Sequence, residues 1–497
     1  MVFRTTPGYP SKPGVPRQPV DHAIPSIPSI PISYMDAIPI LKALNGHGPR
    51  AKDLNEFWTS NLGLEYKGVK YNVGPSPDNL VLNLVNEQEY VTTPMWDVIG
   101  IINGTLSDEV IVVGNHRDAW VAGGAADPNS GSAALNEVVR SFGQALRLGW
   151  KPLRTIVFAS WDGEEYGLVG STEWVEEYLP WLAKANVAYV NIDVACSGPV
   201  FHVSASPPLN NIIYEVTGMV LSPNQTIKGQ TVRDAWSGRI STMGSGSDFT
   251  AFQDYAGIPS IDMGFASSKH SAVYHYHSNY DSYHWMATYG DPGFHYHATA
   301  AKILALFTAK LAETPVLPMN ITDYAIALKS YVAQVAAKLD PSKKEDAQEA
   351  RFRPAPSASK MSGDLASLTR IFKRLERAVS NLHREALKFD AHAASLAEKA
   401  GEDIPWWKWL SKLKLYYDIR KANTKIKYFE RNFLYEPGLD SRSWFKHVVF
   451  APGLWTGYAG AVFPGLVEAI DEKDYRNAER WVLIIEGALE KAKDSLK

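Results

Sequence analysis

The sequence predicts an α/β protein, with a mostly parallel sheet flanked by helices and an all-helical region after it. Two observations support this fold class. From about residue 91, short apolar runs alternate with amphipathic helical stretches, and strands that alternate with helices form parallel sheets covered on both faces. Beyond residue 320 the strand signals stop and long stretches of helical periodicity follow. We therefore expect a central α/β domain and a helical C-terminal domain.

The expected strands are short apolar runs that end at polar or glycine-rich segments. They cover residues 97–103, 109–114, 155–160, 188–193 and 258–263.

The expected helices show apolar residues at helical spacing. One covers residues 130–148, where Ala133, Val138, Val139, Phe142 and Leu146 share a face, and another covers residues 171–184. In the tail, residues 365–397 and 474–496 have the same periodicity, and a stretch of small residues at 353–363 interrupts the helical region.

Composition narrows the class of protein. The 497 residues are 45% hydrophobic, which is enough apolar material for the cores of two to three domains. Fifty basic and 53 acidic side chains give a net charge of −3, which argues against nucleic acid as a partner. The charge is uneven, because residues 1–320 hold 20 basic and 29 acidic side chains while residues 321–497 hold 30 and 24. The tail therefore has a different kind of surface.

The cysteine content and the hydropathy say little about the compartment. The single cysteine, Cys196, excludes a disulfide framework and a cysteine-based zinc module. No run of about 18 apolar residues is present, so no segment is expected to span a membrane. Three glycosylation sequons, at Asn103, Asn224 and Asn320, favour the secretory route slightly.

Acidic and histidine residues gather just after the predicted strands, where open parallel sheets bind their ligands. They are His116, Asp118, Asp127, Glu164, Glu165, Asp193 and His277. A hydrolytic site with two zinc ions needs a bridging carboxylate, one His and one carboxylate for each ion, and a further carboxylate that accepts a proton. Each motif alone is common in turns and at helix starts. Their joint occurrence at successive strand ends indicates a metal site.

Specific motifs extend this indication to a family. They are His116-Arg-Asp, Asp127-Pro-x-Ser-Gly, Trp161-Asp-Gly-Glu-Glu-x-Gly-Leu, Asn191-Ile-Asp, Tyr276-His-Ser and Tyr458-Ala-Gly-x-x-Phe-Pro-Gly. With these motifs the chain resembles the glutamate carboxypeptidase II branch of the M28 zinc peptidases, a superfamily that includes the transferrin receptor. The similarity runs from about Thr6 to the C-terminus.

The resemblance implies a domain organisation. Residues 91–318 would form a zinc peptidase domain with the zinc exopeptidase fold, and residues 319–497 a helical dimerisation domain like that of the transferrin receptor. The related enzymes carry a membrane anchor, a first peptidase segment and most of an apical (protease-associated) domain ahead of the matching region. Residues 1–90 are therefore expected to be a partial apical segment.

The resemblance also implies the roles of the site residues. His116 and Asp193 would bind one zinc ion, Glu165 and His277 the other, and Asp127 would bridge the two, with a cis bond to Pro128. The general base would be Glu164, and Tyr276 would hydrogen-bond the substrate carbonyl or the oxyanion. The implied activity is metallo-exopeptidase hydrolysis of small peptides by a metal-bridged hydroxide.

A structural calcium ion is implied by the same resemblance. Its ligands would be Thr6 and Tyr9, in a Thr-Pro-Gly-Tyr sequence, together with Glu173 and Glu176. Two carboxylates at i and i+3 share one helix face and suit a hard cation.

The substrate pocket departs from the family pattern. Tyr458 is retained and could hold a terminal carboxylate, but Gly457 stands where the family has a glutamate-binding lysine. The family's two substrate-side arginines fall at Asp262 and Gly264, and a neighbouring asparagine at Ser247. Without those cations, glutamate specificity is disfavoured. Aminopeptidase or dipeptidase action and carboxypeptidase action both remain open.

Partners and compartment follow from the resemblance. The helical tail would form a homodimer, and the apolar stretch Trp406, Trp407, Trp409 and Leu410 suits either an interface or an ordinary core. The expected compartment is the secretory pathway or an extracellular or vacuolar lumen. The alternative to an enzyme is a non-catalytic receptor or sorting scaffold of the transferrin-receptor type.

Overall fold

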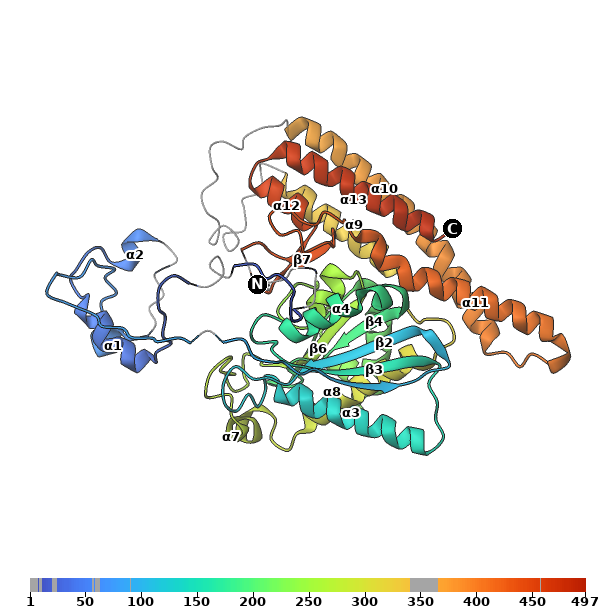
Figure 1. Ribbon diagram of the computed structural model, residues 1–497, viewed down its shortest axis with the longest axis horizontal. Coiled ribbons are helices and arrows are strands. Elements are labelled where there is room, and N and C mark those ends of the chain that lie inside the picture. The colour runs from blue at the N-terminus through green and yellow to red at the C-terminus, as the bar shows by residue number, and fades with distance from the viewer. Residues whose placement is uncertain are drawn as a thin grey trace. The chain divides into compact units, whose positions relative to one another are not determined.

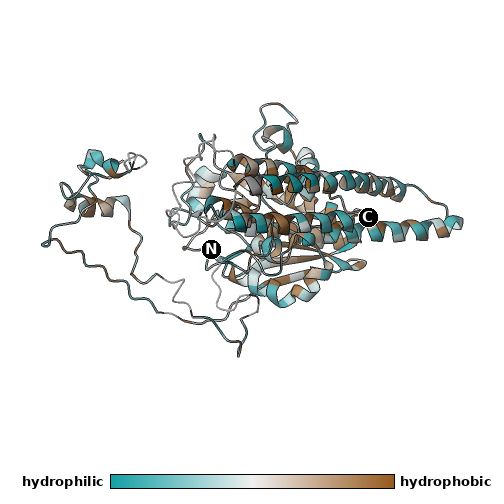
Figure 2. Ribbon diagram, turned by 90° about the horizontal axis from the view of Figure 1, so that it is seen from above, coloured by the Kyte–Doolittle hydropathy of each residue, from teal (hydrophilic) through white to brown (hydrophobic). Residues whose placement is uncertain are grey.

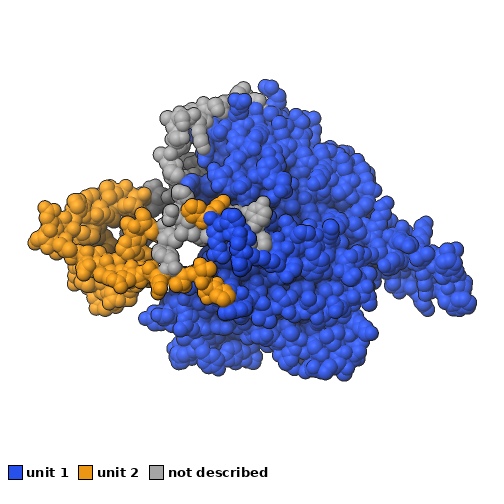
Figure 3. All heavy atoms as spheres, in the orientation of Figure 1, with its two compact units in different colours: residues 1–17, 95–497 blue, residues 18–94 orange. Residues whose placement is uncertain are grey.

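The computed structural model describes residues 8, 11–19, 25–55, 58, 63–89, 91–339, 365–455 and 457–497. The chain divides into two compact units, which Figure 3 distinguishes by colour. The larger consists of Met1–Arg17 and Met95–Lys497, and the smaller of Gln18–Pro94. The expected domain boundaries near residues 90 and 318 stay predictions.

The smaller unit has little regular structure. It contains the helices α1 (Tyr34–Ala43) and α2 (Ala51–Leu54) and a short 3-10 helix (Glu65–Lys67). Ser33 caps α1 by accepting a hydrogen bond from the Asp36 N–H. None of these helices has a buried residue, so the unit has no substantial core of its own among the residues described.

A six-stranded sheet forms the centre of the larger unit (Figure 1). Its order is β1-β3-β2-β4-β6-β5. The strands are β1 (Val98–Ile102), β2 (Leu106–His116), β3 (Arg154–Trp161), β4 (Asn186–Asn191), β5 (Val200–Ala205) and β6 (Ser260–Ala266). The four central strands are mutually parallel, whereas β1 and β5 pair antiparallel at the two edges.

The predicted fold class is confirmed, and the sheet adds two features to it. All five predicted strands are present, but β1 runs antiparallel to its neighbour, and β5 was not predicted. The β5 strand follows β4 closely and pairs back onto β6 through residues such as Phe201 and Phe265. Its burial alternates, as expected of an edge strand with one buried face.

Helices cover both faces of the sheet. On one face α3 (Asn129–Arg147), α5 (Asn210–Met219) and α8 (His295–Glu313) pack against side chains such as Ile111 and Val113. On the other, α4 (Val169–Ala185) and a π-helix (Ala251–Tyr255) pack against Val110 and Val112. Alternate residues of β2 thus face different helices, because strand side chains have a period of two. Short helices α6 (Val232–Ala235) and α7 (Tyr283–Trp285) lie in the connections.

The C-terminal part is helical, as predicted. It contains α9 (Ile321–Lys338), α10 (Leu365–Ala400), α11 (Trp409–Phe429), α12 (Pro464–Asp471) and α13 (Tyr475–Ser495), with a small hairpin of β7 (Phe450–Pro452) and β8 (Gly460–Val462). The small-residue stretch at 353–363 lies outside the described residues.

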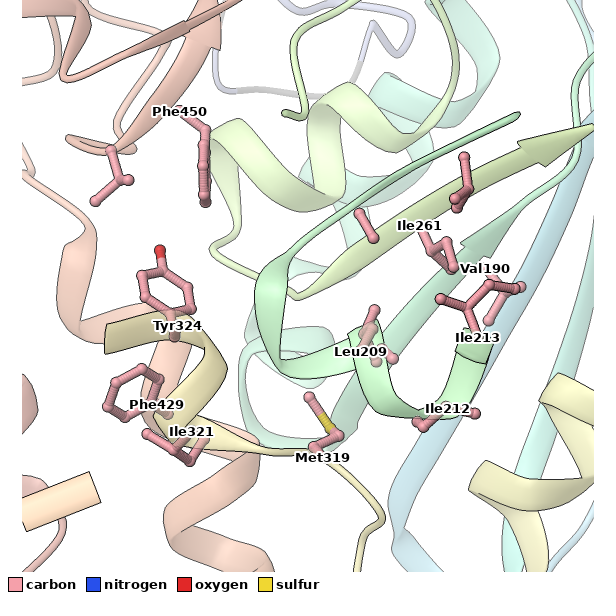
Figure 4. Packing of buried hydrophobic residues seen from close by; sticks show 14 of the residues in the cluster. Val190, Leu209, Ile212, Ile213, Ile261, Met319, Ile321, Tyr324, Phe429 and Phe450 are labelled. Carbon is pink, nitrogen blue, oxygen red and sulfur yellow. The ribbon is translucent and has the colours of Figure 1, made fainter. Parts of the chain in front are cut away.

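The sheet and the C-terminal helices share one hydrophobic core. Figure 4 shows Val190 and Ile261 of the sheet, Leu209 and Met319 next to them, and Tyr324 and Phe429 of the helices within one packed region. A buried carboxylate also joins the two parts. Glu430 accepts hydrogen bonds from Ser206 Oγ (2.7 Å) and Tyr324 Oη (2.9 Å). The peptidase-like sheet is therefore fixed to the helical tail.

Candidate metal centre

The parallel strands bring the predicted metal-binding residues to one edge of the sheet. β2 ends at His116, β3 ends at Trp161 just before the two glutamates, and β4 ends at Asn191 just before Asp193. Because these strands are parallel neighbours, their carboxyl ends meet at the same edge.

One group of possible metal ligands consists of His116, Asp127 and Asp193. His116 Nε2 lies 2.9 Å from Asp193 Oδ1 and 3.3 Å from Asp127 Oδ1. The other ring nitrogen, Nδ1, is 2.9 Å from the Asp118 carbonyl oxygen. A proton on Nδ1 satisfies that contact and leaves Nε2 free to bind a metal ion.

A second group consists of Asp127, Glu165 and His277. His277 Nε2 lies 3.1 Å from Glu165 Oε2 and 3.4 Å from Asp127 Oδ2. Asp127 therefore belongs to both groups and offers a different oxygen to each. All five residues that the resemblance implies as zinc ligands meet in two adjoining groups.

The loop that carries Asp127 is held by a residue outside the motifs. Asp281 Oδ1 accepts a hydrogen bond from the Ala126 N–H (2.8 Å), and Oδ2 accepts one from the Asp127 N–H (3.1 Å). Tyr274 Oη donates to the same carboxylate (3.2 Å). The bond from Asp127 to Pro128 is cis, as the resemblance implies.

Glycine at position 131 allows the close approach of α3 to the end of β4. A Cβ atom there would lie 2.0 Å from the Asp193 carbonyl oxygen and 2.5 Å from Asn115 Nδ2. Only glycine fits without displacing the segment that carries Asp193.

Glu164 belongs to neither group. Its Oε2 atom lies 4.0 Å from His116 Nε2, and the residue is buried. Asp118 fixes this turn, because its carboxylate oxygens accept hydrogen bonds from the N–H groups of Glu164 (3.1 Å) and Glu165 (3.2 Å). Glu164 therefore lies next to the first group, where it could serve as a proton acceptor.

Burial and neighbouring negative charges raise the pKa values of two of these carboxyl groups. Burial, with Asp193 nearby, raises the pKa of Glu164 to about 10. Burial, with Asp127 nearby, raises the pKa of Glu165 to about 7. Burial opposes the charged form of His116, but the surrounding carboxylates outweigh it and hold its pKa well above the ordinary value.

The donor set fits zinc. Each group offers one imidazole nitrogen and carboxylate oxygens, the donors of hydrolytic zinc sites, and three protein ligands leave a position for water. Within the described part of the chain, no lysine or arginine lies within ion-pair distance of Asp127, Glu164, Glu165 or Asp193. Two divalent cations would compensate this buried negative charge.

A cavity of about 1050 Å³ opens beside the two groups. Asp127 and Asp193 line it, and Tyr276 and Tyr458 also belong to its wall. Arg239 is the one lysine or arginine among the described lining residues. This volume suits a small peptide.

Comparison with known protein families separates the chain into the same two parts, the sheet-containing part and the helical C-terminal part. Peptidase family M28 matches residues 97–289, and the transferrin receptor-like dimerisation domain matches residues 371–497. The chain therefore contains a domain of peptidase family M28.

Curated relatives of this M28 chain have several names. A probable glutamate carboxypeptidase of Arthroderma benhamiae is 42% identical over 458 residues, which are 91% of this chain and 57% of that protein. Vacuolar protein sorting-associated protein 70 of Saccharomyces cerevisiae is 31% identical over 97% of this chain and 58% of that protein. Aminopeptidase NAALADL1 of Mus musculus is 31% identical over 92% of this chain and 58% of that protein. The M28 chain spans less than two thirds of the length of these relatives.

The predicted substrate-side residues lie in different surroundings. Tyr276 Oη lies 3.3 Å from Tyr458 Oη, and both side chains are about half exposed at the cavity. Ser247 also lines the cavity but is buried, and its hydroxyl accepts a hydrogen bond from Asn191 Nδ2 (2.9 Å). Asn191 also donates to Asp262 Oδ1 (2.9 Å). Ser247 is thus engaged by the protein, while the two tyrosines face the open space.

Two of the four implied calcium ligands lie together in this M28 chain. Glu176 Oε1 accepts a hydrogen bond from the Gly8 N–H (2.8 Å), and Glu173 Oε1 accepts one from Ser11 Oγ (3.0 Å). Thr6 and Tyr9 lie outside the described residues. The N-terminal segment therefore lies against both glutamates.

Three acidic residues at or near the candidate site were assigned no role from the sequence. Asp281 holds the Asp127 loop, Asp118 holds the Glu164 turn, and Asp248 lies fully buried nearby. Of these, only Asp118 lies inside a motif, in His-Arg-Asp. Of the histidines outside the two groups, His275 and His295 are exposed, whereas His297 is buried against Asp291, with 2.7 Å between Nδ1 and Oδ2.

A third group of possible ligands, Cys196, Asp291 and His297, is also present. Burial raises the pKa of the Cys196 thiol to about 12, so the thiol stays protonated at ordinary pH. Because a metal ion binds the thiolate form, this group is poorly suited to a metal ion. Cys196 is a buried free cysteine.

Proposed function

We propose that the chain is a metallo-exopeptidase with two zinc ions, which hydrolyses small peptides. The observation that supports this most strongly is that Asp127 presents one oxygen to each of two histidine–carboxylate groups. His116 and Asp193 would hold one ion with Asp127, and Glu165 and His277 the other. When bound, the ions supply a water of lowered pKa and polarise the peptide carbonyl.

The chain's own residues supply the proton transfers and the orientation of the substrate. With two divalent cations offsetting the burial that raises its pKa, Glu164 would be ionised. It would then accept a proton from the attacking water and return it to the leaving amine, for which its place beside the first group is suitable. Tyr276 donates a hydrogen bond to the oxygen of the carbonyl under attack.

Substitutions of the two adjacent glutamates test the proposed roles, because one residue would accept a proton and the other would bind zinc. Glu164→Gln should keep bound zinc and lose peptide hydrolysis by at least about 100-fold, because only the proton acceptor is removed. Glu165→Gln should lose zinc as well as activity, because a ligand of one group is removed. Glu137→Gln, on the exposed surface of α3, serves as the control with unchanged zinc and activity. Full activity in Glu164→Gln would overturn the assignment, and an inactive wild type that binds no zinc would favour the scaffold alternative.

We propose that the substrate is a small peptide without a preference for C-terminal glutamate. Among the described residues that line the cavity, Arg239 is the one lysine or arginine. Gly457 has no side chain that could bind a glutamate carboxylate. A peptide panel with free and blocked termini tests this. Equal cleavage of N-acetylated and free peptides would exclude aminopeptidase action, and a strong preference for C-terminal glutamate would overturn the proposal.

A homodimer through the helical tail and a structural calcium ion complete the proposal. The match of residues 371–497 to a dimerisation domain supports the first. The position of Glu173 and Glu176 against the N-terminal segment supports the second, with Thr6 and Tyr9 as the remaining ligands. Glu173→Gln/Glu176→Gln should abolish stabilisation of the chain by calcium. An unchanged calcium effect would exclude this site.

The proposed compartment is the secretory route or the lumen of the vacuole, where the three sequons could be glycosylated. Among the helices described, none is long and apolar enough to cross a membrane. A mass shift on glycosidase treatment of the protein from its source cells tests the compartment. No shift would remove the support that the sequons give.

A further inference from the structure

Strands β5 and β6 contribute a polar wall to the cavity beside the metal centre. Val203 of β5 and Ile261 of β6 belong to the main hydrophobic core, whereas the next residue of each strand, Ser204 and Asp262, lines the cavity. Side chains of a strand alternate between its two faces, so one face of these strands packs on the core and the other faces the cavity. Figure 2 shows hydrophobic and hydrophilic residues interspersed in the larger unit as a whole.

Asp262 lies in a row of polar residues that crosses three neighbouring strands. It is directly opposite Asn191 of β4 on one side and Ser204 of β5 on the other. Residues opposite one another in a sheet place their side chains on the same face. Asn191 Nδ2 donates hydrogen bonds to Asp262 Oδ1 and to Ser247 Oγ, each at 2.9 Å. The sheet therefore fixes the position of a carboxylate in the cavity wall.

A chain of hydrogen bonds behind the wall holds Asn191 in this orientation. Trp161 Nε1 donates to Tyr189 Oη (2.9 Å), and Tyr189 Oη donates to Asn191 Oδ1 (2.7 Å). All three side chains are fully buried. Because Asn191 Oδ1 accepts from Tyr189, its Nδ2 group is directed toward Asp262. The Asp262 side chain is thus positioned before any ligand enters the cavity.

The Asp262 carboxylate has no positive partner in the part of the chain that the structure describes. No described lysine, arginine or histidine forms an ion pair with it. Arg239 lines the same cavity but is exposed, and burial lowers the pKa of His202, so this histidine is neutral at ordinary pH. Burial, with Asp193 nearby, raises the pKa of Asp262 to about 6, which leaves the carboxyl group mostly ionised at neutral pH.

The proposed metal ions would not balance this charge. Two divalent ions carry as many positive charges as the carboxylates of the centre carry negative charges when ionised, namely those of Asp127, Glu164, Glu165 and Asp193. Asp262 belongs to neither group of possible ligands. Its negative charge therefore remains in the cavity wall. A carboxylate removed from water without a counter-charge favours a ligand that brings a positive charge.

We infer that Asp262 binds a positively charged amine of the substrate, and that the chain selects peptides with an ammonium group close to the bond that is cleaved. This inference rests on the proposed function and adds the substrate class to it. The ammonium group is either the free N-terminus of the peptide or a lysine side chain, because both offer N–H donors and a full positive charge. Asp262 is a specificity-determining residue in this account and takes no part in the proton transfers.

Peptides that differ in charge test the inference on the full, zinc-loaded chain. The panel consists of alanyl-alanine, N-acetyl-alanyl-alanine, N-acetyl-lysyl-alanine and N-acetyl-glutamyl-alanine. At least one of the two peptides with an ammonium group should be cleaved with a kcat/KM about 10-fold or more above that of N-acetyl-alanyl-alanine, as expected for a hydrogen bond between charged groups. Preference for alanyl-alanine assigns the N-terminus as the bound group, and preference for the lysyl peptide assigns the side chain.

Substitutions assign the preference to one residue. Asp262→Asn keeps the shape of the side chain and an acceptor for Asn191, and it should remove the preference for an ammonium group. Asp262→Glu keeps the charge and should retain part of the preference. The matched control is Ser204→Ala, which changes the residue directly opposite Asp262 in the same wall and should keep the full preference. Zinc content and circular dichroism of each variant show that the fold and the metal centre are retained.

Binding is measured separately from hydrolysis. Isothermal titration calorimetry of the preferred peptide with zinc-loaded Glu164→Gln should give a dissociation constant about 10-fold lower than with Glu164→Gln/Asp262→Asn. An unchanged preference in Asp262→Asn, or a wild type that prefers the glutamyl peptide, would overturn the inference alone. A wild type that binds the ammonium peptides through Asp262 and cleaves none of them would support the inference and overturn the proposed function. A chain that neither binds nor cleaves the panel would overturn both.

Discussion

The carboxylate of Asp281 accepts a hydrogen bond from the backbone N–H of Asp127, with 3.1 Å between the two heavy atoms. Its second oxygen accepts one from the neighbouring Ala126 N–H at 2.8 Å. Asp281 comes four residues after His277, so one short segment provides a candidate ligand of the second group and also holds Asp127, which belongs to both groups. The two halves of the centre are thereby fixed relative to each other.

Asp281→Asn should lower zinc affinity about 10- to 100-fold, because a side-chain amide cannot accept hydrogen bonds at both of its heavy atoms. Zinc competition with a chelating dye measures this. Asp291→Asn is the matched control, since Asp291 is equally buried but holds His297. The control should lose stability and keep its zinc affinity. Equal zinc affinity in the two variants would show that Asp281 does not position Asp127.

Gly131→Ala should reduce zinc content and stability. The added Cβ would come within 2.0 Å of the Asp193 carbonyl oxygen, so either α3 or the segment that carries Asp193 must move. Gly143→Ala in the same helix meets nothing within 4 Å and should stabilise the chain by up to about 1 kcal/mol. Metal analysis and chemical denaturation of both variants make the comparison. A Gly131→Ala protein with normal zinc content would contradict the close packing described above.

The Glu430 carboxylate should be important for stability. It is fully buried, and Oε1 receives Gln253 Nε2 (2.8 Å) and lies 2.9 Å from His447 Nε2, in addition to its bonds with Ser206 and Tyr324. Glu430→Gln would place an amide donor against these donors and should cost about 2–4 kcal/mol of unfolding free energy. Glu436→Gln, on an exposed side chain, should cost less than about 0.5 kcal/mol. A small loss at Glu430 would mean that the network contributes little.

Cys196 should be unreactive in the folded protein. Burial, with Asp291 nearby, raises the pKa of its thiol to about 12, so at pH 8 only about one molecule in 10⁴ carries the reactive thiolate. A colourimetric thiol reagent should therefore label the native chain slowly and the chain in denaturant fully. Rapid labelling of native protein would show that the thiol is accessible or less perturbed.

The edge of the sheet at which the candidate ligands gather could be predicted, because these residues follow the strands directly in the sequence. His116, Glu165 and Asp193 come at or just after the ends of β2, β3 and β4, and parallel strands bring such ends together without any further information. Their assignment to two groups came from the family resemblance, and the geometry brings the same residues together.

Other features depend on tertiary contacts that local patterns do not contain. Asp281 supports Asp127 across the fold and has no motif of its own. The β5 strand pairs with β6, about 60 residues away in the chain, so its alternation is meaningful only once that partner is known. The sequence could not decide between core and surface for Trp406 and Trp409, because helical periodicity indicates an apolar face without showing what covers it.

The zinc content per chain most directly tests the proposal that Asp127 is shared by two zinc sites. Metal analysis of the purified chain should give about two zinc ions, and Asp127→Asn should lose both, because both groups share Asp127. His277→Ala should lose one ion more readily than the other, since His277 belongs to one group only. A well-folded wild type that binds no zinc after metal addition, or an Asp127→Asn variant that keeps two ions, would contradict the account.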